Sequence, residues 1–227
     1  MLEIVDKIPV ILNALPYILQ GGVVTLITVI GSLALGFCIG LPLAVLQVYG
    51  PSFIRRLIGV YVWFFRGMPI LLLLFLFYFG LFEVIGLNLS TITASCLVLG
   101  MASAAYQSQI FRGSIETLPV GQFRAARALG ARPRDVFFKV ILPGAMPFIF
   151  TGLQISMGYA WFSLVAGEML AGEYGLGYLI WNSFMLVQYP VIIIAMITLG
   201  VIGSLSSLLI RMIGNRLMQW KVREEVR

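Results

Sequence analysis

The chain has 227 residues, of which 60% are hydrophobic and only 11% are charged, and its formal net charge is +6. Together with a mean hydropathy of +1.02, this composition excludes an ordinary soluble domain and predicts a polytopic membrane protein. Histidine is absent, and the two cysteines, Cys38 and Cys96, each lie inside an apolar run. A His-based triad, a His metal site and a structural disulfide are therefore not expected, and no Gly-Lys-Ser/Thr phosphate loop occurs. We predict a chain without catalytic residues of its own, without a metal or cofactor, and without a nucleic-acid partner.

Uncharged runs follow one another along the chain at 8–54, 67–82, 84–111, 140–167 and 174–210. Because a hydrocarbon core about 30 Å thick takes about 20 helical residues, each run can carry a span, the second by borrowing flanking residues. The runs are continuous and lack the alternation of a β-barrel, which favours helices. We predict an all-α polytopic fold of one domain, 1–227, with five transmembrane helices near 22–48, 58–82, 90–112, 141–167 and 190–212.

The first and last runs are longer than one span needs. Pro9, Pro16 and the pair Gly21-Gly22 predict a break in the first run, with a surface helix leading into the span; six spans are the alternative. Residues 174–188 are polar or glycine-rich enough for a short re-entrant or interfacial helix before the final crossing.

Basic residues indicate the orientation, because lysine and arginine concentrate on the cytoplasmic side of membrane proteins. The first connection, the third connection and the C-terminal tail hold 14 of the 15 basic residues: Arg55, Arg56, Arg66; Arg112, Arg124, Arg127, Arg132, Arg134, Lys139; Arg211, Arg216, Lys221, Arg223, Arg227. The other two connections hold none. Five spans with the N-terminus outside and the C-terminus inside satisfy this bias, and Arg66 is expected to be a cytoplasmic end anchor.

Several residues inside the spans are candidates for a solute path. The third run contains an unusually polar cluster that includes Tyr106, Gln107 and Gln109, and polar groups at membrane depth face protein or a wet cavity. A path and plain interhelical hydrogen bonding explain this cluster equally well. Trp161 and Tyr106 could shape a path or simply pack. Glu168 could meet a cationic solute or a receptor, or be a solvated carboxylate at a helix end.

The segment 121–143 is the long basic stretch of the chain. Alanine-rich residues after Gly121 predict a short helix that ends at Gly130, with Pro133 just beyond. Phe123 and Leu129 offer apolar anchors for another protein. A basic surface helix held by anionic lipid is the alternative from the residues alone.

This segment resembles the cytoplasmic coupling loop of ATP-binding-cassette importer permeases, in the spacing of Ala125-Ala126, Gly130 and Ile141-Leu142-Pro143. The resemblance implies a coupling helix at about 118–130 that docks into a cytoplasmic ATPase and transmits its closing to the spans. The implied contact residues are Gly121, Gln122, Arg124, Ala125, Ala126, Leu129 and Gly130. Arg124 stands where the family usually has glutamate, which suggests a compensating acidic residue on the ATPase or a contact made mainly by its neighbours.

The resemblance extends over nearly the whole chain. Strings such as Phe65-Arg66-Gly67-Met68-Pro69 and Ile110-Phe111-Arg112-Gly113 are similar to the polar amino acid branch of these permeases, whereas 164–180 is more similar to permeases for sulfonates, taurine or nitrate. Ala160-Trp161 replaces a Lys-Asp pair of the amino acid branch. The candidate residues of the solute path are therefore Tyr106, Gln107, Gln109, Trp161, Ser163 and Glu168.

The partners that the resemblance implies are nucleotide-binding ATPase subunits, a second permease subunit in a homo- or heterodimer, an extracytoplasmic solute-binding protein, and the lipid of a prokaryotic inner or plasma membrane. Two rival functions stay open. A secondary transporter would need an ion site at membrane depth, yet the interiors of the runs hold no acid, lysine or histidine. A membrane scaffold would not need the spacing of the coupling loop.

Overall fold

The computed structural model describes residues 8–218, apart from the side chains at positions 8, 170 and 171. This part of the chain is all-helical and contains no strand, which confirms the predicted fold class. The elements in order are α2 (Ile8–Tyr49), α3 (Ser52–Gly67), α4 (Ile70–Phe75), the π-helical turn η1 (Leu76–Leu81), α5 (Phe82–Val84), α6 (Thr91–Glu116), α7 (Val120–Ala128), α8 (Pro133–Val136), the π-helical turn η2 (Phe137–Ile141), α9 (Leu142–Ala171), α10 (Leu176–Met185) and α11 (Tyr189–Leu217).

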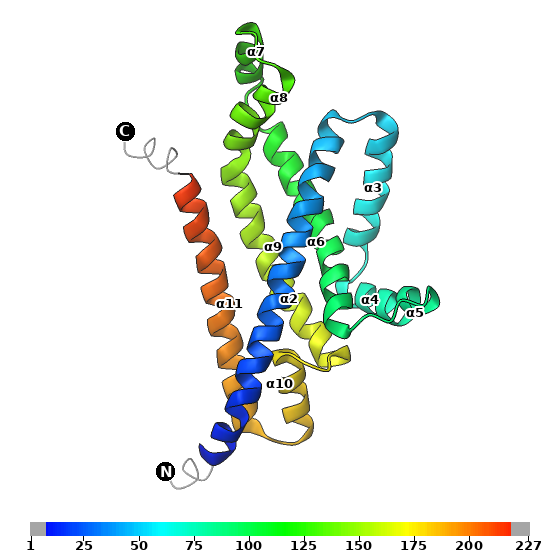
Figure 1. Cartoon of the computed structure of the whole chain (residues 1–227), viewed down its shortest axis with the longest axis vertical. Helices are drawn as coiled ribbons and strands as arrows, with labels where there is room; N and C mark the ends of the chain where they lie inside the picture. The colour runs from blue at the N-terminus through cyan, green and yellow to red at the C-terminus, as the bar shows by residue number, and fades with distance from the viewer. Residues whose placement is uncertain (1–7, 219–227) are drawn as a thin grey trace.

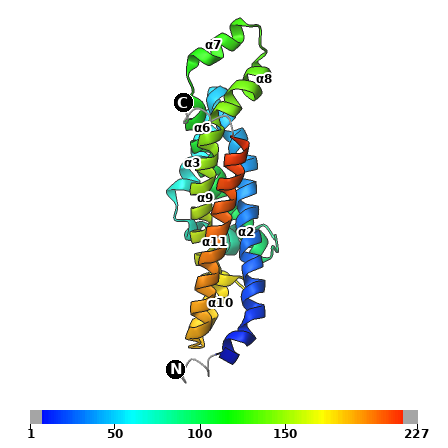
Figure 2. The same cartoon turned by 90° about the vertical axis from the view of Figure 1, so that its left-hand side faces the viewer.

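Four long helices, α2, α6, α9 and α11, run side by side along the long axis of the molecule (Figures 1 and 2). The short helix α10 packs at the end where α2 begins, and α7 projects beyond the opposite end. One apolar core fills the middle of the bundle around Val29, Val98 and Leu164. A second core, around Phe111, Ile115 and Ile149, lies toward the α7 end, so that α7 stands on a packed base.

Helix α2 is continuous for 42 residues, so the predicted break near Gly21-Gly22 is wrong. At 1.5 Å per residue it is about 63 Å long, which exceeds a hydrocarbon core of about 30 Å. The two glycines serve close packing instead: a Cβ at Gly21 would lie 3.1 Å from the carbonyl carbon of Gly175, and one at Gly22 would lie 3.0 Å from Ile202. Neighbouring helices can support prolines and glycines inside membrane helices, and Pro16 lies within the continuous helix here.

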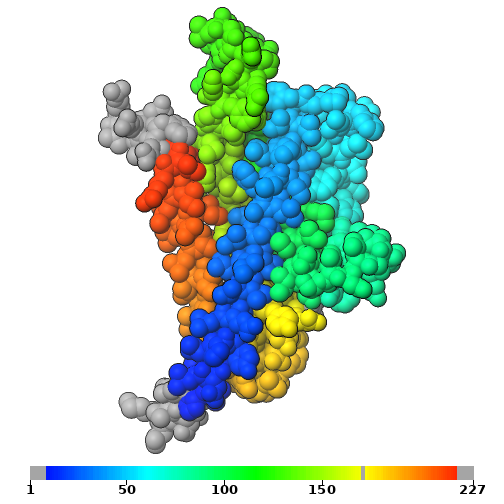
Figure 3. All heavy atoms as spheres, in the orientation of Figure 1, coloured from blue at the N-terminus to red at the C-terminus, as the bar shows by residue number. Residues whose placement is uncertain are grey.

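The segment predicted as a second span at 58–82 is not one straight helix. Helix α3 ends at Gly67, and the chain turns by 107° before the stretch 70–84. Pro69 explains the break, because it lacks an N–H group and pushes the preceding residue out of the helical region; Met68 has φ −99° and ψ 142°. The α4 to α5 stretch consequently projects sideways from the bundle (Figures 1 and 3).

By length and composition, three helices of the described part qualify as membrane spans, in the ranges Pro9–Tyr49, Pro133–Met169 and Tyr189–Leu217, and a fourth follows if the bent pair counts as one. Helix α6 is long enough to cross, at about 39 Å for 26 residues, but it carries the polar cluster and does not qualify on hydropathy. The count of five stays a prediction.

Arginines at the start of α3, in the α7 to α8 hairpin and in the last turn of α11 lie toward one end of the bundle (Figure 1). Lys221, Arg223 and Arg227, which also entered the predicted orientation, lie outside the described residues. The position of Arg66 contradicts its predicted role as a cytoplasmic end anchor. Arg66 lies in the last turn of α3, at the opposite end of that helix from Arg55 and Arg56.

Candidate functional site: the basic hairpin and the polar residues of the bundle

The basic segment folds as a helical hairpin. Helix α7 ends in a Schellman motif: Gly130 has φ +79°, its N–H donates to Arg127 O (2.9 Å), and Ala131 N–H donates to Ala126 O (3.1 Å). Pro133 then opens α8 at a position where its missing N–H costs nothing. A short helix thus occupies 120–128, within the stretch where the sequence predicts one.

The two faces of α7 differ. Phe123 and Ala126 are half-buried and pack on the second core, together with Ala131. The other predicted contact residues are exposed, namely Gly121, Gln122, Arg124, Ala125, Leu129 and Gly130. Leu129 is 89% exposed, so its apolar side chain is accessible to a docked protein. The hairpin therefore presents an apolar and basic face while Phe123 and Ala126 fix it to the bundle.

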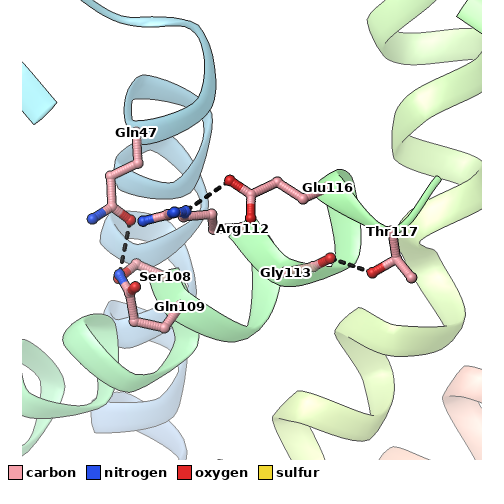
Figure 4. Close-up of polar contacts among 7 residues, drawn as sticks. All are labelled: Gln47, Ser108, Gln109, Arg112, Gly113, Glu116 and Thr117. Atoms are coloured by element: carbon pink, nitrogen blue, oxygen red, sulfur yellow. Dashed lines mark hydrogen bonds and ion pairs between the residues drawn. The ribbon is translucent and has the colours of Figure 1, made fainter. Parts of the chain in front are cut away.

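Polar contacts gather at the end of α6 that leads into the hairpin, within α6 itself and between α6 and α2 (Figure 4). Gln109 Nε2 on α6 donates to Gln47 Oε1 on α2 at 2.8 Å, and Arg112 Nε donates to Glu116 Oε1 at 2.8 Å. The Thr117 hydroxyl donates to the Gly113 carbonyl at the end of α6. Gln109, a predicted path residue, thus joins α2 to α6 near the hairpin end.

Gln107 lies fully buried between α2 and α6. Its Nε2 donates to Ser103 Oγ (2.8 Å) and to Leu33 O (3.3 Å). The two helices approach closely here because Gly36 and Gly40 have no side chains. A Cβ added at Gly36 would lie 2.6 Å from Ser103 Oγ, and one added at Gly40 would lie 3.1 Å from Ala104 O. The Gly-x-x-x-Gly face of α2 therefore packs within the chain.

Trp161 and Ser163 on α9 are also buried. Trp161 Nε1 donates to Ser206 Oγ on α11 at 3.1 Å, whereas Ser163 Oγ has no hydrogen-bond partner in the described part. The indole N–H of Trp161 thus faces the neighbouring helix α11. The assignment of Trp161 and Ser163 to a solute path stays a prediction.

Glu168 is 6% exposed, which contradicts a solvated carboxylate at a helix end. Its oxygens accept hydrogen bonds from the Thr25 hydroxyl (2.9 Å) and from Gly177 N–H (2.8 Å), and Leu176 N–H donates to Thr25 Oγ1 (2.9 Å). The carboxyl group thus caps the N-terminus of α10, where the helix dipole favours negative charge. This clasp joins α2, α9 and α10.

Tyr106, a half-buried predicted path residue, lies where α3, α6 and α9 meet. Its ring packs against that of Tyr159 with centroids 5.1 Å apart, and the Arg66 Cζ lies 5.1 Å from the Tyr106 ring centroid. Tyr159 is 52% exposed. The structure therefore brings together α3, α6 and α9 around one cation and two tyrosines.

A larger cavity of about 620 Å³ lies at the end of the bundle opposite the hairpin, between the first half of α2 and helices α10 and α11. Figure 3 shows α10 beside the first half of α2 on this face. Its lining includes Asn13, Tyr17, Glu173, Tyr178 and Asn182 and none of the predicted path residues.

Sequence reasoning missed three features of these sites. In the sequence, Thr25 is one threonine in an apolar run, and its role becomes visible only where α9 and α10 pack against it. Nothing in the sequence around Tyr159 indicates a functional residue. Arg66 carries a usable signal, because it directly precedes the helix-breaking Gly67-Met68-Pro69.

The described part of the chain is thus a helical membrane bundle with a projecting basic hairpin, and similarity to known proteins shows its family. The model of the family described as "Binding-protein-dependent transport system inner membrane component" matches residues 36–221, so the chain belongs to this family. A protein of Brucella abortus (strain 2308) described as a probable ABC transporter permease is 30% identical over 206 residues, which cover 86% of this chain and 75% of that protein.

Two further relatives are named for the solutes that they transport. The taurine transport system permease of Escherichia coli (strain K12) is 29% identical over 183 residues, covering 80% of this chain and 63% of the relative. A nitrate import permease of Leptolyngbya laminosa is 36% identical over 104 residues, covering 46% of this chain and 37% of the relative.

A solved structure has the same fold. A chain of the MetNI methionine ABC transporter in an inward-facing conformation superposes with a TM-score of 0.75 at 23% identity, covering 91% of this chain and 97% of that one.

Proposed function

We propose that this chain is the transmembrane permease subunit of an ATP-driven importer in the inner or plasma membrane of a prokaryote. It would pair with a second permease subunit, identical or paralogous, and form the solute path between them. ATP hydrolysis would occur in cytoplasmic partner subunits, and an extracytoplasmic solute-binding protein would deliver the solute. The family match over 36–221 is the observation that carries this proposal.

The hairpin supports a coupling role. Helix α7 lies beyond the bundle, carries exposed arginines and the exposed Leu129, and is fixed from below by Phe123 and Ala126. A helix held at its base and exposed on its outer face can transmit a push from a docked protein to α6 and α9, which continue directly from the hairpin. We propose that Gly121, Gln122, Arg124, Ala125 and Leu129 contact the ATPase, while Ala126 and Gly130 shape the helix.

The candidates for the transported solute come from the resemblance to other permeases. The motifs in the first half of the chain support a polar amino acid. The taurine and nitrate relatives favour a second candidate, a sulfonate or another small organic or inorganic ion.

The coupling role is tested by purifying the tagged chain with the ATPase expressed from the same cells in mild detergent. We expect Leu129→Ser and Gly130→Leu to lose the ATPase and ATP-dependent uptake, while the purified chain keeps its helical content. Gly86→Leu is the matched control, since Gly86 also has positive φ (+72°) and, like Gly130, has open space around it. Unchanged ATPase recovery in both hairpin variants would exclude the coupling role, and recovery of no ATPase with the wild-type chain would exclude the importer.

A further inference from the structure

We propose that Arg66, with Tyr106 and Tyr159, forms a subsite that binds the oxyanion of the transported solute, be it nitrate, a sulfonate or a carboxylate. The inference rests on the proposed function, because it assumes that a solute passes this chain.

Arg66 lies well away from the basic end of the bundle. It is ten residues beyond Arg56 on the same helix, a distance of about 15 Å along the axis, or half of a hydrocarbon core about 30 Å thick. Charged side chains at such depth are costly and usually face a protein interior or a water-filled path. A purely anchoring role would place the guanidinium beside Arg55 and Arg56 instead.

The helix breaks immediately after this cation. The 107° turn at Met68 and Pro69 interrupts the segment between α3 and α4. Irregular backbone at membrane depth is tolerated where it is buried in protein or lines a wet cavity, and interrupted helices mark binding sites in other transporters. The break and the cation are independent observations that point to the same place.

The guanidinium has no acidic partner. Within residues 8–218 the ion pairs are Arg112 with Glu116 and Lys139 with Asp135, so Arg66 pairs with no carboxylate of the described chain. Its Cζ lies 5.1 Å from the centroid of the Tyr106 ring, a cation–π contact, and a guanidinium with five N–H donors keeps several of them for a ligand beside such a contact. Arg66 and Tyr159 are both exposed in the single chain, on a surface that a solute can reach.

Hydroxyl groups lie behind the tyrosines. Ser156 Oγ is buried, with its residue 5% exposed, and has no hydrogen-bond partner in the described part. Ser103, Tyr106, Ser156 and Tyr159 line a cavity of about 20 Å³. This cavity has room for one water rather than for a solute. We infer that the solute lies on the open side, against Arg66 and Tyr159.

An arginine fork matches one chemistry that the solutes of the relatives share. Nitrate, the sulfonate of taurine and the carboxylate of methionine each present adjacent oxygens that carry negative charge. The planar guanidinium binds such groups through two parallel N–H···O bonds, which lysine cannot reproduce. The structure thus favours an anionic or zwitterionic solute over a purely cationic one.

The test measures equilibrium binding of nitrate, taurine and L-methionine to the assembled permease and ATPase complex, without receptor, in nanodiscs of phosphatidylcholine. At least one probe should bind the wild type. Arg66→Gln should weaken that probe about 10- to 100-fold, as expected for losing a hydrogen-bonded charge, in a complex recovered with all its subunits. Arg66→Lys should weaken it less.

Arg55→Gln is the matched control, since Arg55 lies on the same helix, is exposed as Arg66 is, and donates to Ser52 Oγ at the opposite end. It should leave binding unchanged. L-Methionine methyl ester, which keeps the amine but lacks the carboxylate, should bind weakly and equally to wild type and Arg66→Gln. If Arg66→Gln does not assemble, Arg66→Lys and Tyr159→Phe carry the comparison.

The proposal is overturned if none of the three probes binds an assembled complex, or if Arg66→Gln and Arg66→Lys bind as the wild type does. If both Arg66 variants make the two permease subunits dissociate while Tyr159→Phe binds the probe normally, Arg66 makes an intersubunit contact. This outcome also overturns the proposal. An effect of Arg66→Gln that appears only after anionic lipid is added would assign the cation to a lipid headgroup. Failure of the complex to form with the wild-type chain would instead refute the proposed function.

Discussion

Replacing Gly175 by alanine tests the clasp between α9 and α10. Gly175 precedes α10 with φ 113° and ψ 169°, a conformation that only glycine adopts readily. A Cβ there would lie 2.3 Å from Glu168 Cδ and 2.4 Å from Oε1, so the buried carboxyl group must move.

Two costs add. Holding an L-residue in this backbone region costs about 1 to 3 kcal/mol. Displacing Glu168 leaves the Gly177 N–H, which donates to Oε2 at 2.8 Å, without its acceptor in a buried place, at about 1 to 3 kcal/mol. The expected destabilisation is therefore about 2 to 6 kcal/mol.

Unfolding in mixed detergent and dodecyl sulfate micelles, followed by helical circular dichroism, measures this difference. Gly86→Ala is the control, because Gly86 also has positive φ (+72°) but no atom lies within 4 Å of its added Cβ. It should cost only about 1 to 2 kcal/mol, the strain of the left-handed conformation. If the two variants unfold at the same denaturant fraction, the steric conflict with Glu168 does not exist and the clasp is not rigid.

Three further substitutions test packing and strain. Val187→Gly should stabilise the protein by about 1 kcal/mol in thermal unfolding, because Val187 is a β-branched residue held at φ 59° between α10 and α11; an unchanged or lower melting temperature would contradict the strain. Gly36→Ala should cost about 1 to 3 kcal/mol by pushing α2 off Ser103, whereas Gly158→Ala, with open space around it, should be neutral or gain up to about 1 kcal/mol; equal effects would argue against the close α2–α6 contact. Thr25→Val should cost about 1 to 3 kcal/mol by leaving Glu168 and Leu176 N–H without their hydroxyl partner, while Thr151→Val, at an exposed site, should be silent in the same dodecyl sulfate titration.

Local signals made part of the site predictable. The alanines, Gly130 and Pro133 specify a short helix, a left-handed cap and a new helix start through interactions within a dozen residues, and the structure shows these features. The exposure of Leu129 could also be predicted from the sequence, since an apolar residue beside a cap glycine in a basic segment has few apolar neighbours to pack against.

Long-range packing decided what local signals could not. Gly21 and Gly22 look like a break, but α10 and α11 lie against them and hold α2 straight. Glu168 looks like a solvated carboxylate at a helix end, but it is buried and accepts hydrogen bonds from Thr25, distant by 143 residues, and from the Gly177 N–H of α10. In each case two environments are physically reasonable for the same residue. The helix that packs against it determines which environment it has.

By itself, the sequence determined the all-helical membrane class, the site of the basic hairpin and its cap, because composition and short-range backbone preferences act without reference to the rest of the chain. The tertiary structure alone decided that α2 is one long helix, that Glu168 caps α10, and that Arg66 lies against Tyr106 near Tyr159. These outcomes depend on which helices pack together, and the burial that drives this packing arises between residues far apart in the chain.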